Sequence, residues 1–245
     1  MTYLIDALQN DEEYIVFFTG AGMSTESGLP DFRSANDGLW GKIDPAQVAS
    51  VDAMNRQVEQ FFEFYKMRID AVNDVQPNKG HYILSDWQKR GYIHDIITQN
   101  VDGFHTTAGC KRVHELHGTL LTVRCSHCEK QFPNTTFAEA DFHCDECEHP
   151  LRPNVVLFGE MLPEKPFNES LIAAQSATTF VVLGSSLTVS PANQFPLIAK
   201  ESGAHLIIVN RDETPFDSFA DEVIQDQTIN EYLLHVHETI EKRER

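Results

Sequence analysis

A short apolar run that leads into a glycine turn near the start of the chain most constrains the fold. Residues 15–18 read Ile-Val-Phe-Phe, and Gly20 and Gly22 follow just beyond them. A buried strand that enters such a turn often seats a dinucleotide pyrophosphate, because glycine lets the backbone approach the phosphates. The dehydrogenase pattern is broken here, since Thr25 stands where a third glycine is expected. The segment therefore predicts a nucleotide site with an unusual use.

The polar loop beyond the glycine turn supports that prediction. Asp31, Phe32 and Arg33 place a carboxylate, an aromatic ring and a guanidinium in consecutive positions. This set suggests a site where the cofactor itself reacts. An oxidoreductase is the least favoured class, because the acidic residue expected about 20 positions after the glycine turn is not evident.

Helix and strand patterns alternate along the rest of the chain. Elements expected from the apolar spacing are helices at 2–9, at 57–72 and from Pro77 onward, and strands at 14–18, 93–98, 180–183 and 206–209. Alternation of helices with buried strands predicts an α/β fold, with a mostly parallel sheet covered on both faces.

Polar or glycine positions follow four of these strands. Gly20, Gln99, Gly184 and Asn210 each come directly after an expected strand end. Ligands of such sheets bind beyond the carboxyl ends of the strands. We therefore expect these four positions to meet in one crevice.

Four of the five cysteines form two close pairs. Cys125 and Cys128 make one pair, and Cys144 and Cys147 make the other, within a segment (122–151) that is poor in aliphatic residues. Two such knuckles complete a shell of four thiolates, which suits a closed structural zinc with no position for a catalytic water. A redox dithiol pair or an iron–sulfur site is the alternative.

His117 is the candidate general base. The preceding His114 and Glu115 resemble part of a zinc-protease helix, but the spacing to His117 is wrong and Gly118 indicates a turn. A histidine suits general-base work near neutral pH. A lone histidine is more often structural, yet the polar groups expected around this one favour a functional role.

Two further polar clusters are expected in the same crevice. Residues 99–102 (Gln-Asn-Val-Asp) either cap a turn or offer hydrogen bonds to a ribose and a carboxamide. Gly184, Ser185 and Ser186 offer backbone amides and hydroxyls to phosphates, although serine-rich turns are common.

The charge balance limits the partners. With 19 basic and 37 acidic residues, the formal net charge is −18. Nucleic acid is therefore not expected as a partner, because phosphate binding needs a basic face. The charge suits solubility and is compatible with basic, lysine-bearing peptides. No membrane association is expected, since no apolar run approaches the roughly 20 residues that cross a bilayer. The chain's start lacks a secretory pattern, so a cytoplasmic location is expected.

Taken together, the motifs resemble those of the sirtuins, in particular the bacterial members. The resemblance extends from about residue 12 to residue 230. It is carried by six motifs in the family's order: Gly20-Ala21-Gly22-Met23-Ser24 through Phe32-Arg33, Gln99-Asn100-Val101-Asp102, Glu115-Leu116-His117-Gly118, the paired cysteines, Arg152-Pro153 through Phe158-Gly159-Glu160, and Gly184-Ser185-Ser186-Leu187.

The resemblance implies a fold, an activity and partners. The fold is a Rossmann-like domain, here residues 1–40, 80–121 and 152–245, with a smaller domain from residues 41–79 and 122–151. The activity is NAD-dependent protein lysine deacylation, which consumes NAD and yields nicotinamide, free lysine and O-acyl-ADP-ribose. The partners are acylated proteins or peptides, which pair as a strand with residues 156–160 and 186–189.

The resemblance also assigns roles to single residues. His117 is the general base on a ribose hydroxyl, Asn100 positions ribose and water, and Asp102 with Val101 holds the carboxamide. Phe32 covers the reaction centre. The remaining cofactor contacts fall on Gly20, Ala21, Gly22, Thr25, Asp31, Arg33, Gln99, Gly184, Ser185, Ser186 and Asn210, and substrate contacts on Val156, Phe158, Gly159 and Leu187.

The acyl preference is left open by mixed signals. Tyr65 and Arg68 match the Tyr-x-x-Arg of sirtuins that remove acidic acyl groups, and their spacing puts both on one helical face. They equally fit an amphipathic helix with Tyr65 in the core and Arg68 in solvent. Pro30-Asp31-Phe32 resembles the ordinary deacetylases, so deacetylation is favoured, with desuccinylation or demalonylation as the alternative.

Two other functions remain as alternatives. A protein ADP-ribosyltransferase shares the first chemical step, and a binding module would sense NAD or an acylated tail without turnover. His117 and Asn100 favour the deacylase, since both catalytic motifs are complete.

Overall fold

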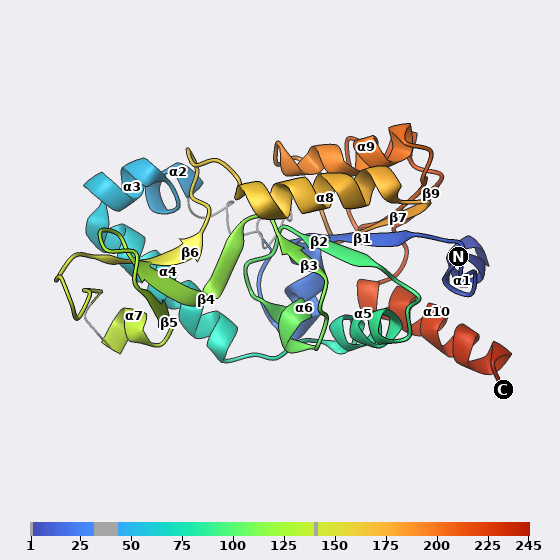
Figure 1. Cartoon of the computed structure of the whole chain (residues 1–245), viewed down its shortest axis with the longest axis horizontal. Coiled ribbons are helices and arrows are strands. Elements are labelled where there is room, and N and C mark those ends of the chain that lie inside the picture. The colour runs from blue at the N-terminus through green and yellow to red at the C-terminus, as the bar shows by residue number, and fades with distance from the viewer. Residues whose placement is uncertain (1, 32–43, 140–141) are drawn as a thin grey trace.

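Two β-sheets organise the molecule (Figure 1). The computed structural model describes residues 2–31, 44–139 and 142–245. The larger sheet has six parallel strands in the order β3-β2-β1-β7-β8-β9, and the smaller has three antiparallel strands in the order β5-β4-β6. The larger sheet's strands, in that order, are Val113–Glu115, Asp95–Thr98, Ile15–Thr19, Thr179–Leu183, His205–Val209 and Glu222–Ile224.

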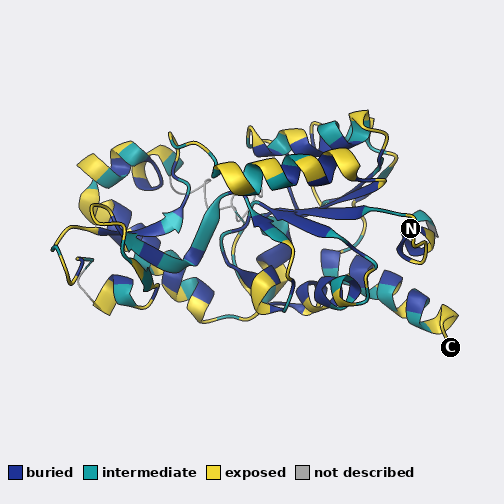
Figure 2. Ribbon diagram, viewed as in Figure 1, coloured by how far each residue is buried: buried dark blue, intermediate teal, exposed yellow. Residues whose placement is uncertain are grey.

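Helices cover both faces of the larger sheet, as Figures 1 and 2 show. One face packs against α1 (Thr2–Leu8), α5 (Lys79–Lys89) and α10 (Ile229–Arg243), and the other against α8 (Glu164–Ser176) and α9 (Phe195–Glu201). Successive side chains of a strand point to opposite faces. Ile15 and Phe17 of β1 therefore enter the first core, whereas Val16 and Phe18 enter the second. The predicted α/β fold is confirmed.

The expected elements of this sheet lie close to their predicted bounds. The four predicted strands appear as β1, β2, β7 and β8, and their residues are buried almost throughout. Asn78, at the expected start of α5, caps it by accepting hydrogen bonds from the amides of Gly80 and His81. The edge strands β3 and β9 were not predicted, because three-residue strands carry too little periodicity to be detected.

The smaller sheet consists of β4 (Gly118–Cys125), β5 (Gln131–Pro133) and β6 (Leu151–Val155). It shares an apolar core with α4 (Val58–Asn73), where Phe61, Phe62, Tyr65 and Ile69 are buried at the predicted helical spacing. Other short elements are α2 (Pro45–Val48), α3 (Val51–Arg56), α6 (Phe104–Thr107), α7 (Thr136–Glu139) and three 3₁₀ turns, η1 (Ala21–Ser27), η3 (Ala192–Gln194) and η4 (Asp217–Phe219). Among the described residues, no helix is both long and apolar enough to cross a membrane.

Candidate functional site

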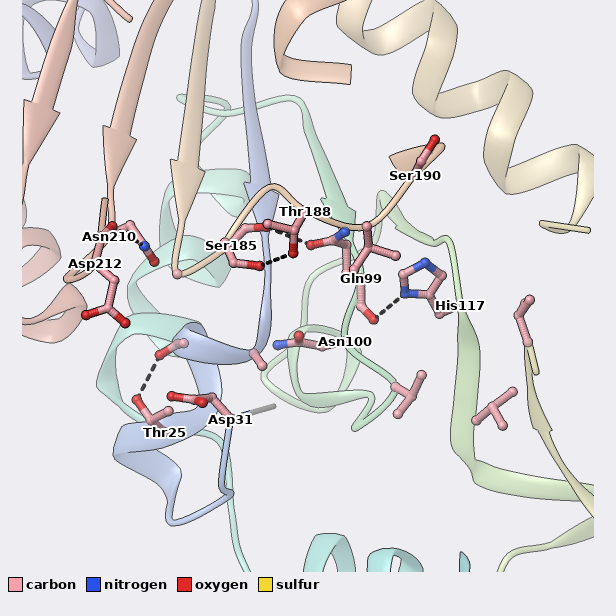
Figure 3. Close-up of a pocket in the computed structure, with 18 of the residues that line it drawn as sticks. Thr25, Asp31, Gln99, Asn100, His117, Ser185, Thr188, Ser190, Asn210 and Asp212 are labelled. Carbon is pink, nitrogen blue, oxygen red and sulfur yellow. Dashed lines mark hydrogen bonds between the residues drawn. The ribbon is translucent and has the colours of Figure 1, made fainter. Parts of the chain in front are cut away.

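A cavity of about 1420 Å³ opens beyond the carboxyl ends of the central strands. Gln99, Gly184 and Asn210 line it, as expected, and Ala21 and Gly22 represent the glycine turn. Figure 3 shows Asn210 and Asp212 toward one end of the cavity, His117 toward the other, and Gln99 between them. The expected crevice therefore exists, and it is long enough to hold an extended ligand.

Most of the predicted site residues share this cavity. Those that line it are Ala21, Gly22, Thr25, Asp31, Tyr65, Arg68, Gln99, Asn100, Val101, His117, Val156, Phe158, Gly159, Gly184, Ser185, Ser186 and Asn210. Gly20, Asp102 and Leu187 lie behind the lining, and the last two are buried. Phe32 and Arg33 lie outside the described residues.

Two glycine loops pack backbone against backbone at the base of the cavity. The amide of Gly22 donates to the carbonyl of Gly184 at 2.9 Å. A Cβ on Gly22 would lie 2.7 Å from the Cα of Gly184, and one on Gly20 would lie 2.7 Å from the Gly184 oxygen. Contacts this short exclude any side chain, so the first two glycines are needed for the packing of the two loops.

Gln99 connects the histidine to the serine loop. The carbonyl oxygen of Gln99 lies 2.9 Å from Nδ1 of His117, and a carbonyl can only accept. Nδ1 therefore carries the proton, and in the neutral ring the lone pair is on Nε2. The side-chain oxygen of Gln99 accepts from the Ser185 hydroxyl at 2.8 Å. The same residue thus sets the tautomer of His117 and holds the loop after β7.

A buried hydrogen-bond chain orients Asn100. Its side-chain nitrogen donates to the Ser24 hydroxyl at 3.2 Å, and Ser24 donates to Asp102 at 2.7 Å. Because the Asn100 nitrogen is directed toward Ser24, the other end of the amide, its oxygen, is left for the cavity. Burial raises the pKa of Asp102, although the Phe104 amide and the Ser24 hydroxyl partly offset this. Asp102 is therefore linked to the cavity by hydrogen bonds through Ser24 and Asn100.

Tyr65 and Arg68 of α4 both line the cavity, and Tyr65 also belongs to the apolar core shared with the smaller sheet, as the alternative expected. The Arg68 guanidinium lies 5.9 Å from the centre of the Tyr65 ring. Tyr65 is 2% exposed, and burial raises the pKa of its hydroxyl to about 12. The hydroxyl is therefore a neutral hydrogen-bond donor, and the guanidinium beside it is a positive charge.

The segment from Val156 to Glu160 forms another wall. The Val156 amide donates to the carbonyl of His117 at 2.9 Å, which connects this wall directly to the histidine. Phe158 pairs as a parallel bridge with Ser50: its amide donates to Ala49 at 2.9 Å, and its carbonyl accepts from Val51 at 3.1 Å. One side of the segment is thus fixed by residues 49–51, while Val156, Phe158 and Gly159 line the cavity.

The four cysteines gather at the far end of the smaller sheet. Their sulfur atoms all lie within 4.8 Å of one another, with Cys125–Cys147 at 3.4 Å and Cys128–Cys144 at 3.8 Å. A tetrahedral zinc with Zn–S bonds of roughly 2.3 Å has edges of roughly 3.8 Å, so the donor set fits one zinc ion. The amides of His127 and Cys128 each donate to the Cys125 sulfur at 3.4 Å, and such hydrogen bonds stabilise a negatively charged sulfur. That favours the thiolate a metal requires.

Several lining residues were not predicted. Gln225, Asp226, Gln227 and Thr228 reach the cavity from the loop between β9 and α10. Glu26 joins the same wall, since it accepts from the Thr228 hydroxyl at 3.1 Å and the Asn230 amide at 3.0 Å. Their only sequence signal was the cap at Thr228, whose hydroxyl accepts from the Glu231 amide.

Comparison with protein families and relatives gives one consistent result. Residues 20–191 match the model of the Sir2 family. The chain is 56% identical over 223 residues to an NAD-dependent protein deacetylase of Oceanobacillus iheyensis, which covers 91% of this chain and 94% of the relative. It is 51% identical to NAD-dependent protein deacetylase 1 of Geobacillus kaustophilus, over 93% of each chain.

Solved structures agree with the sequence relatives. A complex described as Sir2, p53 peptide and NAD+ superposes with a TM-score of 0.87 at 36% identity, covering 98% of each chain. A Sir2 variant with a deacetylated p53 peptide and 3′-O-acetyl ADP-ribose superposes with a TM-score of 0.90 at 38% identity, again over 98% of each chain.

Proposed function

Since this chain belongs to the Sir2 family, we infer that it is an NAD-dependent protein lysine deacetylase. Its substrates are proteins that carry acylated lysine, and its co-substrate is NAD. NAD supplies the ribose carbon to which the acyl oxygen is transferred, and the products are nicotinamide, deacylated lysine and O-acyl-ADP-ribose. The observation that carries this conclusion is the placement of His117 and Asn100 in one cavity with the two glycine loops and the Val156–Glu160 wall.

We propose that His117 is the general base. Its Nδ1 is held by the Gln99 carbonyl, so Nε2 takes the proton of a ribose hydroxyl. General-base catalysis by a positioned histidine contributes about 10²–10⁴-fold. Asn100, oriented through Ser24, presents its carbonyl oxygen to the ribose or to water. Asp102 orients that pair from behind and, with Val101, defines the end that receives the carboxamide.

The remaining contacts are assigned along the cavity. Ala21, Gly22 and Thr25 of the first glycine loop, with Ser185 and Ser186 of the second, bind the phosphates and the nearer ribose. Asn210 follows β8, and its side-chain nitrogen donates to the Asp212 carbonyl at 2.7 Å, so its oxygen faces the adenosine ribose. Asp31 belongs to the same proposed set, as do Phe32 and Arg33. The four cysteines hold one structural zinc, which has no part in the chemistry.

We further propose a division into two domains. Residues 1–40, 80–121 and 152–245 form the NAD-binding domain, and residues 41–79 and 122–151 form the smaller one. The support is that α2, α3 and α4 share one apolar core with the smaller sheet. A cytoplasmic location is part of the same proposal.

Removal of acidic acyl groups is a second candidate activity. The observation that favours it is that Tyr65 and Arg68 line the same cavity as His117. A neutral hydroxyl and a guanidinium bind a carboxylate well, and such charge-assisted hydrogen bonds are roughly twice as strong as neutral ones. Tyr65→Phe with Arg68→Met should therefore lower desuccinylation about 10-fold or more while acetyl removal changes less. Equal loss for the two acyl groups, or no loss for either, would reject this candidate.

The main proposal is tested by product analysis. Purified protein is incubated with acetyl-lysine peptide, with and without NAD, and the products are followed by mass spectrometry. We expect deacetylated peptide and O-acetyl-ADP-ribose in equal amounts, only with NAD. His117→Ala should lower the rate about 10²–10⁴-fold with the fold and zinc content intact. Transfer of ADP-ribose onto protein without lysine deacetylation would instead identify an ADP-ribosyltransferase.

A further inference from the structure

The wall formed by Val156–Glu160 is held by a partly buried ion pair, between Arg152 and Glu160, that none of the roles above uses. Arg152 of β6 is 6% exposed, and its guanidinium meets the carboxylate of Glu160 through two parallel bonds, at 2.7 and 2.9 Å. This bidentate geometry fixes direction as well as distance. Burial alone would raise the pKa of Glu160, but Arg152 and the Leu157 amide outweigh it and hold the pKa below its usual value.

Both partners also bind the backbone of the wall. The Arg152 guanidinium donates to the carbonyl of Val155 at 3.0 Å, and the Glu160 carboxylate accepts from the Leu157 amide at 2.8 Å. The Glu160 amide closes a turn onto the Leu157 carbonyl at 2.9 Å. Gly159 stands inside that turn with φ 98°, a conformation that side chains rarely adopt. The pair thus sets the path of the chain between β6 and α8.

The wall that the pair holds contacts His117, and the pair itself influences Tyr65. The Val156 amide bonds to the His117 carbonyl, so a shift of the wall is passed on to the proposed base. Glu160 itself lines the cavity, as Tyr65 does, and both Arg152 and Glu160 influence the pKa of the Tyr65 hydroxyl. The exposed face of the wall, with Phe158 and Gly159, is the part that the cavity presents to a ligand.

We propose that Arg152 and Glu160 are positioning residues for the acyl-lysine peptide. The pair sets the edge of residues 156–159 against which the peptide backbone forms hydrogen bonds, and it acts without touching NAD. This inference rests on the proposed deacetylase function. Backbone pairing of this kind requires the edge to be in place before the peptide arrives, because each residue ordered during binding costs affinity.

The test compares Glu160→Gln and Arg152→Lys with a matched control. Asp221→Asn is the control, because the Asp221 carboxylate likewise bonds a cation, Lys200 at 2.6 Å, and a backbone amide, Leu206 at 2.8 Å, but lies outside the cavity lining. Steady-state kinetics with acetyl-lysine peptide give kcat and KM, and calorimetry without peptide gives the Kd for NAD. Zinc content and circular dichroism are recorded for every variant.

We expect KM for the peptide to rise about tenfold in both pair variants, the effect of losing one or two net hydrogen bonds. The Kd for NAD should stay within about twofold of wild type, and Asp221→Asn should leave both values unchanged. A peptide KM that stays at the wild-type value, or an equal rise in the Kd for NAD, would overturn the proposal. So would loss of zinc or of secondary structure in both pair variants, since the pair would then serve the fold in general. An inactive wild-type protein would instead refute the proposed function.

Discussion

The six-stranded sheet and the three-stranded sheet differ in how they are stabilised. Every residue of β1 and β7 is buried, and helices cover both faces of that sheet (Figure 2). In the smaller sheet, no residue of β5 is buried and β4 is buried at only three of its eight positions. Since burial of apolar area contributes about 25 cal/mol per Å², the larger sheet gains more stability from its two apolar faces than the smaller sheet gains from the one core it shares with α4.

The cysteine cluster offers the smaller sheet a source of stability other than apolar burial. Cys125 and Cys144 are buried and belong to the apolar core that the sheet shares with α4, so they pack in that core and also belong to the donor set that fits zinc. The candidate site lies where the two sheets meet, because His117 lies in the two-residue connection between Glu115, the last residue of β3, and Gly118, the first residue of β4. Activity should therefore depend on both apolar burial and bound metal, whereas the stability of the larger sheet should depend on apolar burial alone.

Loss of zinc should have the largest effect. Structural zinc sites contribute about 10–16 kcal/mol of apparent binding free energy, which the exposed β5 and its neighbours cannot replace. Cys144→Ala should therefore abolish metal binding and deacetylation while most of the helical circular dichroism remains. Zinc content by mass spectrometry, activity and circular dichroism together check this.

Cys110→Ala is the matched control for that experiment. Cys110 is also a buried cysteine, but it lies outside the group of four and packs in the core beneath the larger sheet. It should keep its zinc and its activity. A metal-free Cys144→Ala protein that still deacetylates at the wild-type rate would show that the smaller sheet does not need the ion.

A substitution at the junction should have the next largest effect. Gly118 has φ 74°, and a Cβ there would lie 2.0 Å from the Asn154 carbonyl oxygen on β6. Gly118→Ala must therefore move β4 away from β6 beside His117. A displacement near 1 Å can cost about 10²-fold in rate, so we expect kcat/KM to fall by about that factor.

Gly91→Ala separates strain from displacement. Gly91 has φ 81°, so the alanine meets similar backbone strain, but a Cβ there has no atom within 4 Å. It should lower the melting temperature and leave kcat/KM unchanged. If the two variants lose activity equally, the junction is not what couples the sheets to the base.

The larger sheet and its crevice were predictable from sequence because their signals are local. An apolar strand followed by glycine or an amide, as at Gly20 and Gln99, states both the element and its end, and parallel strands bring those ends to one edge. The cysteine spacing likewise predicted the donor set. Both signals are patterns within a few neighbouring residues.

The remaining features depend on distances that the sequence does not state. Arg152 and Glu160 are charged residues that would ordinarily be expected in solvent, and only the fold shows that Arg152 is buried and that Glu160 meets it at the cavity wall. The loop between β9 and α10 joins the cavity because β9 pairs with β8. With three residues, β9 is too short to be detected in the sequence. Asp102 was expected to hold the carboxamide, and only the fold shows that its carboxylate accepts a hydrogen bond from Ser24.

The smallest expected effect concerns Glu115 in the larger sheet, where ionisation of a carboxyl lowers the stability of the folded chain. Glu115 is the last residue of β3, opposite Thr98, and burial together with the charge of Asp102 raises its pKa from 4.5 to about 7. Between these two pH values the unfolded chain releases the proton and the folded chain keeps it, so stability falls as pH rises and levels off above about 7. Glu115→Gln removes the titration. The variant should therefore gain a few degrees in melting temperature over wild type at about pH 8, and little at about pH 5.

Glu63→Gln, at an exposed position of α4, should show no such pH-dependent gain. A gain for Glu115→Gln of the same size at both pH values would mean that packing of the amide, and not the ionisation of a buried carboxyl, makes the difference.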